Sequence, residues 1–271
     1  MLIVQLSDLH VRAPGQLAYG RVDTATHLRR CVAHIAALTP RPDAIVVTGD
    51  LVDRGAAEEY EHLLALLRPL PAPVYVIPGN HDDRAALRAA FPSCANLCES
   101  ADFLQYVASV GPLRLIALDT IVPADGGGRL CRARLDWLDE ALRRCTGSPV
   151  VILMHHPPFA TGIGYMDAVG LATDYPLEPI LERHRNVERI LSGHVHRTIV
   201  RRFGGTIAVT APSPAHQVAL DFARGASPCF VMEPPGYLIH RWAQGEGFTT
   251  YAAVVGDYDG PYRFYEDGAQ R

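Results

Sequence analysis

Five short motifs in this sequence carry carboxylate, amide and imidazole groups that could bind divalent metal ions. They are Asp8-Leu9-His10, Gly49–Asp53, Gly79–Asp82, His155-His156 and Gly193–His196. Any one of them alone has an ordinary structural explanation, such as a turn or a helix cap. Together they supply the oxygen and imidazole ligands that borderline-hard divalent metals prefer, without a thiolate.

The candidate ligands are too many for one ion, which takes about four to six ligands. The seven candidates are Asp8, His10, Asp50, Asn80, His155, His194 and His196. A set of this size suits two ions about 3.5–4 Å apart that share a bridging carboxylate. The sequence therefore predicts two divalent metal ions, drawn from Mn, Fe, Co or Zn, because this donor chemistry accepts all four.

Buried strands must bring these motifs together, because each motif follows a short apolar run. The runs are Leu2–Leu6, Ala44–Val47, Val74–Ile77, Val150–Met154 and Arg189–Leu191, with a sixth, less regular run at Leu113–Asp119. Segments with helical periodicity lie between the runs, at about 24–38, 58–67 and 135–144. This alternation predicts an α/β layered sandwich whose ligands bind at the carboxyl ends of the strands.

The pattern changes from about residue 206. Thr206–Thr210 and Gly236–Trp242 are predicted to be antiparallel strands, and little helical periodicity follows them. Tyrosines gather in the last 36 residues, at positions Tyr237, Tyr251, Tyr258, Tyr262 and Tyr265. Such an aromatic ending suits a lid or a subunit interface, or a tail that covers its own sheet.

Composition excludes several classes of function. The 271 residues carry a net charge of −4, and all 25 cationic residues are arginine, which excludes a Schiff-base or P-loop lysine. No basic run indicates a dedicated nucleic-acid partner, and no segment resembles a membrane span or a signal peptide, so we expect a cytoplasmic protein without a membrane partner. The six cysteines lack a disulfide pattern, although Cys94 and Cys98 are close enough to pair.

In order and spacing, the five motifs resemble those of the calcineurin-like metallophosphoesterases. Leu17–Gly20, Pro78–Arg84, Met154–Pro158 and Met166-Asp167 resemble the class III cyclic-nucleotide phosphodiesterases and the bacterial glycerophosphodiesterases. The resemblance runs from residue 2 to about residue 217, and the ending around Gly260-Pro261 is more similar to the glycerophosphodiesterase branch. It implies a four-layer αββα catalytic core at 1–217, followed by a small β-rich, aromatic extension at 218–271 that serves as a lid or in oligomerisation.

The resemblance also implies roles for single residues. Asp8, His10 and His196 would hold the first metal, Asn80, His155 and His194 the second, and Asp50 would bridge them. His81 would lie over the phosphate, either as a general acid or as a group that only orients water or phosphate. Asn80, His81, His216 and Tyr19 are the expected substrate-binding residues.

We therefore expect a phosphodiesterase that hydrolyses small phosphodiesters, glycerophosphodiesters or 3',5'-cyclic nucleotides, by attack of a metal-bound hydroxide. The aromatic ending favours a homodimer or a higher homo-oligomer. One alternative is a phosphomonoesterase or protein phosphatase, because the block Gly49–Gly55 is similar to one in the Ser/Thr protein phosphatases. Another is a catalytically silent interaction scaffold.

Overall fold

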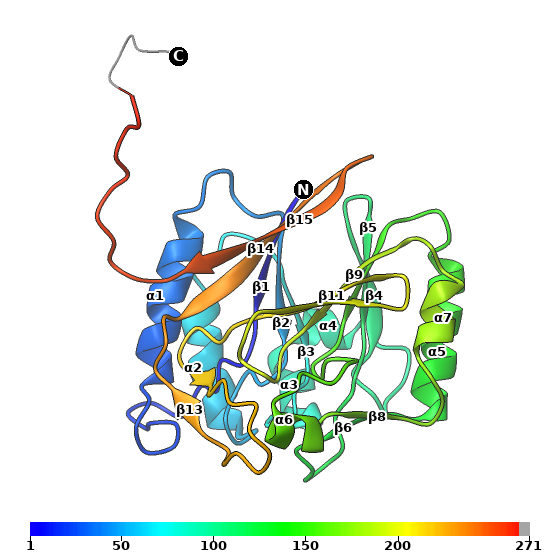
Figure 1. The fold of residues 1–271 in the computed structure, drawn as a ribbon, viewed down its shortest axis with the longest axis horizontal. Coiled ribbons are helices and arrows are strands. Elements are labelled where there is room, and N and C mark those ends of the chain that lie inside the picture. The colour runs from blue at the N-terminus through cyan, green and yellow to red at the C-terminus, as the bar shows by residue number, and fades with distance from the viewer. Residues whose placement is uncertain (266–271) are drawn as a thin grey trace.

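Two β-sheets lie side by side between layers of helices in the computed structural model, which describes residues 1–265 (Figure 1). The first sheet has five strands, in the order β15 (Gly247–Val254), β14 (Gly236–Ala243), β1 (Leu2–Leu6), β2 (Ala44–Thr48) and β3 (Val74–Ile77). The second has six, in the order β10 (Ile199–Phe203), β11 (Thr206–Thr210), β9 (Val187–Ser192), β7 (Val150–Leu153), β5 (Leu113–Ala117) and β4 (Tyr106–Val110).

Helices cover the outer faces of both sheets. They are α1 (Thr24–Ala36), α2 (Ala57–Leu67), α3 (Arg84–Ala90), α4 (Pro92–Ala95), α5 (Arg132–Arg144) and α7 (Glu178–Glu182), whereas the short α6 (Gly164–Ala168) packs against Val195 and Val218 instead. In Figure 1, α1 and α2 flank the first sheet, whereas α5 and α7 flank the second. Two short strand pairs complete the structure: β6 (Gly128–Leu130) with β8 (Leu171–Thr173), and β12 (Gln217–Val218) with β13 (Phe230–Val231).

The hydrophobic core explains the four layers. One buried cluster joins α1 and α2 to the first sheet and continues between the two sheets, where Leu6 and Val46 belong to the same cluster as Val151 and Leu191. A second cluster packs α5 and α7 against the outer face of the six-stranded sheet. The expected αββα sandwich is therefore confirmed, and its central strands β2 and β7 are buried along their whole length because both faces are covered.

Strand pairing at the end of the chain differs from expectation at one point. Thr206–Thr210 was predicted to be antiparallel; it pairs antiparallel with β10 but parallel with β9. The residues expected as an extension contribute two strands of the first sheet, because β14 pairs antiparallel with β1 and β15 with β14. Beyond β15, residues 256–265 run away from the body of the molecule (Figure 1).

The structure bears on the expectations about the cysteines and about membrane-spanning segments. All six cysteines lie among the described residues and all are free thiols, and the Sγ of Cys98 is 3.6 Å from the backbone oxygen of Cys94. Within residues 1–265, no helix has the length and hydropathy needed to cross a bilayer.

Candidate metal centre

The five motifs meet at one end of the two sheets, as the parallel strand directions require. Asp8 and Asp50 follow β1 and β2, Asn80 follows β3, and His155 and His194 follow β7 and β9. They border a cavity of about 430 Å³ whose lining includes His10, Asp50, Asn80, His194 and His196. Side chains from both sheets therefore share one site at the carboxyl ends of the strands.

The first group of possible ligands comprises Asp8, His10, Asp50 and His196, whose ligand atoms all lie within 4.8 Å of one another. The Nε2 atoms of His10 and His196 are 3.2 Å apart. His10 Nε2 is 3.5 Å from Asp50 Oδ2, and His196 Nε2 is 3.5 Å from Asp8 Oδ1. Four donors that face one another at these distances could hold a single cation.

A second group lies on the other side of Asp50. The Oδ1 atom of Asn80 is 3.0 Å from His155 Nε2 and 3.1 Å from His194 Nδ1. His155 Nε2 also lies 3.5 Å from Asp50 Oδ2. The same carboxylate oxygen thus faces a histidine of each group, which is the position that a bridging ligand must occupy.

Each of the four imidazoles holds its second ring nitrogen against an oxygen acceptor. His155 Nδ1 is 2.8 Å from the carbonyl of Thr48, His194 Nε2 is 3.0 Å from that of Val169, and His196 Nδ1 is 3.1 Å from that of His216. His10 Nδ1 faces Asp53 Oδ1 at 3.4 Å. This arrangement fixes each ring and leaves the nitrogen that points into the site free to bind a metal.

Backbone conformation at the site is unusual. Five of the seven candidate ligands have positive φ angles, namely Asp8 (55°), His10 (44°), Asp50 (49°), His194 (70°) and His196 (50°). Residues other than glycine seldom adopt this conformation, which costs about 1–3 kcal/mol each and clusters at functional sites. The loops thus turn sharply after each strand and direct their side chains into the site.

Two of the glycines in these motifs allow the chain segments to approach. A Cβ on Gly79 would lie 2.2 Å from both the backbone nitrogen and Oδ1 of Asp50. A Cβ on Gly193 would lie 1.9 Å from Ser7 Oγ and 2.8 Å from Asp8 Oδ2. The glycine beside each ligand is therefore required by close contact with another ligand loop.

The pKa values of the buried groups shift in both directions. Burial opposes the charge on His155, but Asp50 outweighs it and raises the pKa of His155 to about 9. Burial raises the pKa of Asp8 to about 6. Burial also opposes the charge on Asp50, but His155 and His81 outweigh it and lower the pKa of Asp50 well below its usual value. Burial lowers the pKa of His194 to about 3 and also that of His196, so both imidazoles are neutral, as ligands must be.

Buried ion pairs hold Asp53 in place. Asp53 Oδ2 lies 3.3 Å from Arg12 Nη1, which lies 2.7 Å from Glu59 Oε1 on α2. Glu59 also accepts hydrogen bonds from the backbone N–H groups of Arg54 and Ala56 through Oε2. These contacts connect α2 to the Nδ1 face of His10. The N-cap of α2 is Ala56, so Asp53 faces a candidate ligand and does not cap this helix.

His81 lies beside the first group, and its ligand atom is within 4.8 Å of those of His10 and Asp53. Its Nδ1 is 2.8 Å from the backbone oxygen of Asp53, and its ring meets that of His10 edge-on with centroids 4.6 Å apart. The backbone N–H of His81 donates to Asp50 Oδ1 at 2.9 Å. One third of the side chain is exposed, and the residue lines the cavity. Its Nε2 is the atom left for contact with a substrate.

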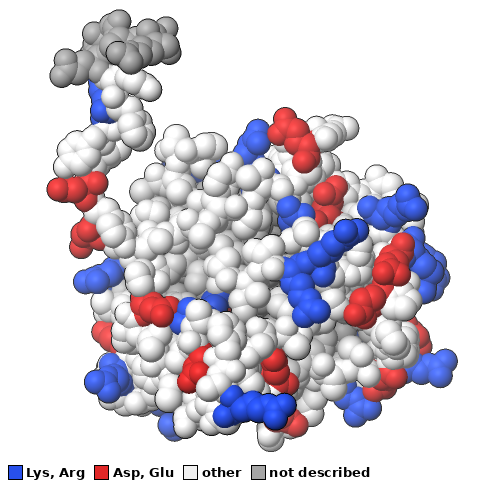
Figure 2. All heavy atoms as spheres, in the orientation of Figure 1, with Lys and Arg blue, Asp and Glu red and all other residues white. Residues whose placement is uncertain are grey.

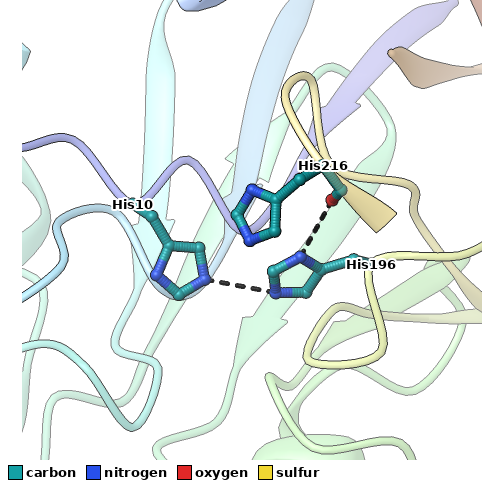
Figure 3. A group of neighbouring side chains, drawn as sticks. All are labelled: His10, His196 and His216. Atoms are coloured by element: carbon teal, nitrogen blue, oxygen red, sulfur yellow. Dashed lines mark hydrogen bonds between the residues drawn. The ribbon is translucent and has the colours of Figure 1, made fainter. Parts of the chain in front are cut away.

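His216 and Tyr19 also border the cavity. Figure 3 shows His216 beside His10 and His196, from three different loops, with its backbone oxygen hydrogen-bonded to His196. The His216 ring lies 4.7 Å from that of His196, and its buried Nδ1 has no hydrogen-bond partner. The Tyr19 ring lies 5.2 Å from that of His216. Both side chains are thus placed where a substrate could reach them.

Some polar residues near the motifs face elsewhere. His156 is hydrogen-bonded through Nδ1 to Thr120 Oγ1 and through Nε2 to the carbonyl of Gly126. Asp119 binds Arg84 with both oxygens, at 2.6 and 2.9 Å.

Several cavity-lining residues were not predicted from the sequence, among them Tyr165, Val169, Cys229 and Phe230. They are mostly apolar and belong to no motif, so no sequence signal marked them.

The chain is similar in sequence to a family of phosphoesterases and to several phosphodiesterases. The family described as calcineurin-like phosphoesterase matches residues 1–198. A probable glycerophosphodiester phosphodiesterase GpdQ of Arcobacter nitrofigilis is 38% identical over 268 residues, 98% of each chain. The 3',5'-cyclic adenosine monophosphate phosphodiesterase CpdA of Pseudomonas aeruginosa is 32% identical, over 89% of this chain and 84% of that one.

Solved structures share the fold. The crystal structure of a dimetal phosphatase from Danio rerio has a TM-score of 0.62 at 16% sequence identity, covering 94% of this chain and 99% of that chain. At this identity the likeness concerns the fold alone. The match of the family over most of the chain, together with relatives above 30% identity along nearly its whole length, shows that the chain belongs to the calcineurin-like phosphoesterase family.

Proposed function

We propose that this protein is a metal-dependent phosphodiesterase that hydrolyses small phosphodiesters. The observation that carries the proposal is Asp50 Oδ2, which lies 3.5 Å from a histidine of each ligand group. A carboxylate in this position could bind both ions of a two-metal site, and such sites are suited to the displacement of a leaving group at phosphorus. The names of the relatives, glycerophosphodiester and cyclic nucleotide phosphodiesterases, support the same reaction.

Seven residues would hold the two ions. We assign Asp8, His10 and His196 to the first, Asn80, His155 and His194 to the second, and Asp50 to both. The donors suit Mn, Fe, Co or Zn, because imidazole, carboxylate and amide oxygen bind all four. When bound, two such ions supply a nucleophilic hydroxide at neutral pH and neutralise charge on the phosphoryl oxygens.

The chain's own contribution to the reaction centres on His81. The departing alkoxide needs a proton, and His81 can donate one from Nε2 while Nδ1 remains hydrogen-bonded to the backbone of Asp53. Its position is fixed at two points, by that bond and by the bond from its N–H to Asp50. Asn80, His216 and Tyr19 are the further substrate contacts in this proposal, since all three line the cavity.

The charge of the cavity supports a diester over a monoester. Asp50 is the sole Asp, Glu, Arg or Lys among the described cavity-lining residues. A phosphomonoester dianion would gain from an arginine that binds two of its three terminal oxygens bidentately. A diester carries a single negative charge and needs no such partner. The phosphomonoesterase alternative is therefore the less favoured reaction class.

The distribution of charged side chains on the surface indicates the kind of partner. On the face shown in Figure 2, cationic and anionic side chains are interspersed and no continuous basic surface crosses it, which suits a small substrate better than a nucleic acid.

We propose a homodimer or higher homo-oligomer, because the exposed side chains of residues 256–265 include Tyr258, Tyr262, Phe264 and Tyr265. We also propose a cytoplasmic location, which suits six free thiols.

In the same proposal, residues 1–217 form the catalytic core, and the extension expected at 218–271 supplies a lid and an oligomerisation arm. The supporting observation is that Val218, Pro228, Cys229 and Phe230 line the cavity. This part of the extension would act as a lid, and the arm beyond β15 would serve oligomerisation.

Hydrolysis of a diester and a monoester with the same leaving group tests the proposal. Chelator-stripped protein is assayed with bis(4-nitrophenyl) phosphate and 4-nitrophenyl phosphate, before and after addition of Mn, Co, Fe or Zn. The proposal expects metal-restored activity with a higher kcat/KM for the diester. Preference for the monoester would favour the phosphatase alternative, and inactivity with every metal would favour the scaffold.

A further inference from the structure

Three rings form one continuous wall of the cavity, which we call the aromatic wall: Tyr19, His216 and Phe230. The Phe230 ring lies 5.2 Å from both the Tyr19 ring and the His216 ring, and Tyr19 and His216 are also 5.2 Å apart. These separations are typical of aromatic side chains in direct contact. The wall begins beside His196 and so extends from the metal centre.

The wall is held in a fixed position by a small hydrophobic cluster of Ala18, Val22 and Ala215, against which Phe230 packs. Ala18 and Val22 exchange two backbone hydrogen bonds of 2.9 Å, and Tyr19 lies in the turn between them with a φ of 52°. Phe230 is fixed from the other side, because β13 pairs with β12 directly after His216. Three segments that are distant in sequence thus present one prearranged surface.

A further part of the cavity lining is apolar. Tyr165, Met166 and Val169, from α6 and the residue that follows it, line the cavity there. The Tyr165 hydroxyl donates to the backbone oxygen of Cys229 at 3.0 Å, which ties α6 to the loop that carries Phe230. That hydroxyl is therefore already engaged by the protein.

This composition is poor in groups that recognise a polyol. Away from the ligands, His81 and the aromatic wall, the described lining consists of Gly126, Tyr165, Met166, Val169, Val218, Pro228 and Cys229. A glycerol group carries hydroxyls that need hydrogen-bond partners when they leave water. A flat aromatic group instead gains from stacking on ring faces and from burial of apolar surface.

We propose that the aromatic wall binds a flat aromatic group of the substrate, such as the base of a nucleotide diester, and that Phe230 is the specificity-determining residue. The inference rests on the phosphodiesterase function proposed above and narrows its substrate class. Phe230 acts by contact with the organic group, at a distance from the reacting phosphorus. Its effect therefore depends on which organic group the substrate retains.

Two substrates with the same leaving group isolate this effect. Bis(4-nitrophenyl) phosphate and ethyl 4-nitrophenyl phosphate both release 4-nitrophenolate, but they retain an aryl and an ethyl group. We expect Phe230→Leu to lower the ratio of their kcat/KM values, aryl over ethyl, about tenfold, the loss that corresponds to one stacking contact. Phe230→Tyr, which keeps the ring, is expected to restore the ratio.

Phe222→Leu is the matched control. Phe222 lies in the segment between β12 and β13 and is 66% exposed, and it is not among the residues that line the cavity. It should leave the ratio unchanged. Thermal unfolding of both leucine variants shows whether each is folded, so that a collapsed variant is not mistaken for a change in specificity.

Binding gives a second readout that needs no turnover. Saturation-transfer NMR on chelator-stripped protein should show contact with the base protons of 5'-AMP, reduced in Phe230→Leu and retained in Phe222→Leu. The proposal is overturned if the ratio is the same in Phe230→Leu and wild type, or if glycerophosphocholine loses more than the aryl diester. Failure of the proposed function is a separate result, namely wild-type protein without diester hydrolysis in any metal.

Discussion

The carboxylate of Asp53 faces the Nδ1 atom of His10 at 3.4 Å, on the opposite side of the imidazole from the nitrogen that meets His196. Asp53 in turn lies 3.3 Å from Arg12, which is paired with Glu59. One candidate ligand of the first metal is therefore oriented by a charged chain that begins on α2.

Removal of the Asp53 carboxylate should weaken the binding of the first metal and leave the binding of the second unchanged. We expect Asp53→Ala to lower the affinity of the first site by about 10–100-fold, the usual cost of losing a group that orients a ligating histidine. Titration against a competing chelator measures the two affinities separately. Asp102→Ala, in an exposed loop, is the control. Equal affinities in Asp53→Ala and wild type would show that Asp53 does not orient His10.

Asn80→Ala should affect the other site. Asn80 Oδ1 faces His155 and His194, both of the second group. We expect the variant to lose occupancy of the second metal more than of the first, because only the second loses a ligand. Metal analysis after graded dialysis gives both occupancies. Loss of the two ions in parallel would contradict the assignment of ligands.

His81→Ala separates catalysis from metal binding. We expect kcat to fall by about 10²–10⁴-fold, the range of a general acid, with metal content nearly unchanged because the His81 ring is outside both ligand groups. His27→Ala, on α1, is the control. If the ions are lost together with activity, His81 contributes to metal binding and the general-acid role fails.

Acid should destabilise the protein through His240, which is buried in β14 and hydrogen-bonded to Gln5 and Thr250. Burial lowers its pKa to about 3, so below its unfolded value of about 6.5 only the unfolded chain gains the proton. The resulting loss of stability is absent above pH 7 and grows to about 2 kcal/mol at pH 5.

Urea unfolding of wild type and His240→Gln at pH 5 and pH 8, on chelator-treated protein, isolates this contribution. The variant should lose about 2 kcal/mol less than wild type on acidification, because it lacks the titrating group. Parallel losses in the two proteins would show that His240 is protonated in the folded state.

The sequence could indicate the seven candidate ligands because they are polar residues placed after buried strands. The strands themselves could be predicted for a related reason, because Val150–Leu153 is apolar throughout and Leu2–Leu6 is apolar except for the buried Gln5. The pairing of Thr206–Thr210 with both β10 and β9 was not predictable, since a short apolar run carries no direction.

The aromatic wall was only partly predictable. Tyr19 and His216 were proposed through resemblance, whereas Phe230 begins the two-residue strand β13, outside any motif, and is placed at the cavity by the pairing of β13 with β12. The orientation of Asp53 likewise depends on Arg12 and Glu59, which meet only after α2 packs beside the first motif. Contacts between distant segments decide such positions, and no local pattern encodes them.

An anomalous difference map from crystals grown with Mn²⁺ tests the central claim most directly. The account predicts two peaks, one within reach of Asp8, His10 and His196 and the other within reach of Asn80, His155 and His194. Both peaks should contact the carboxylate of Asp50. A single peak, or two peaks that do not share Asp50, would contradict it.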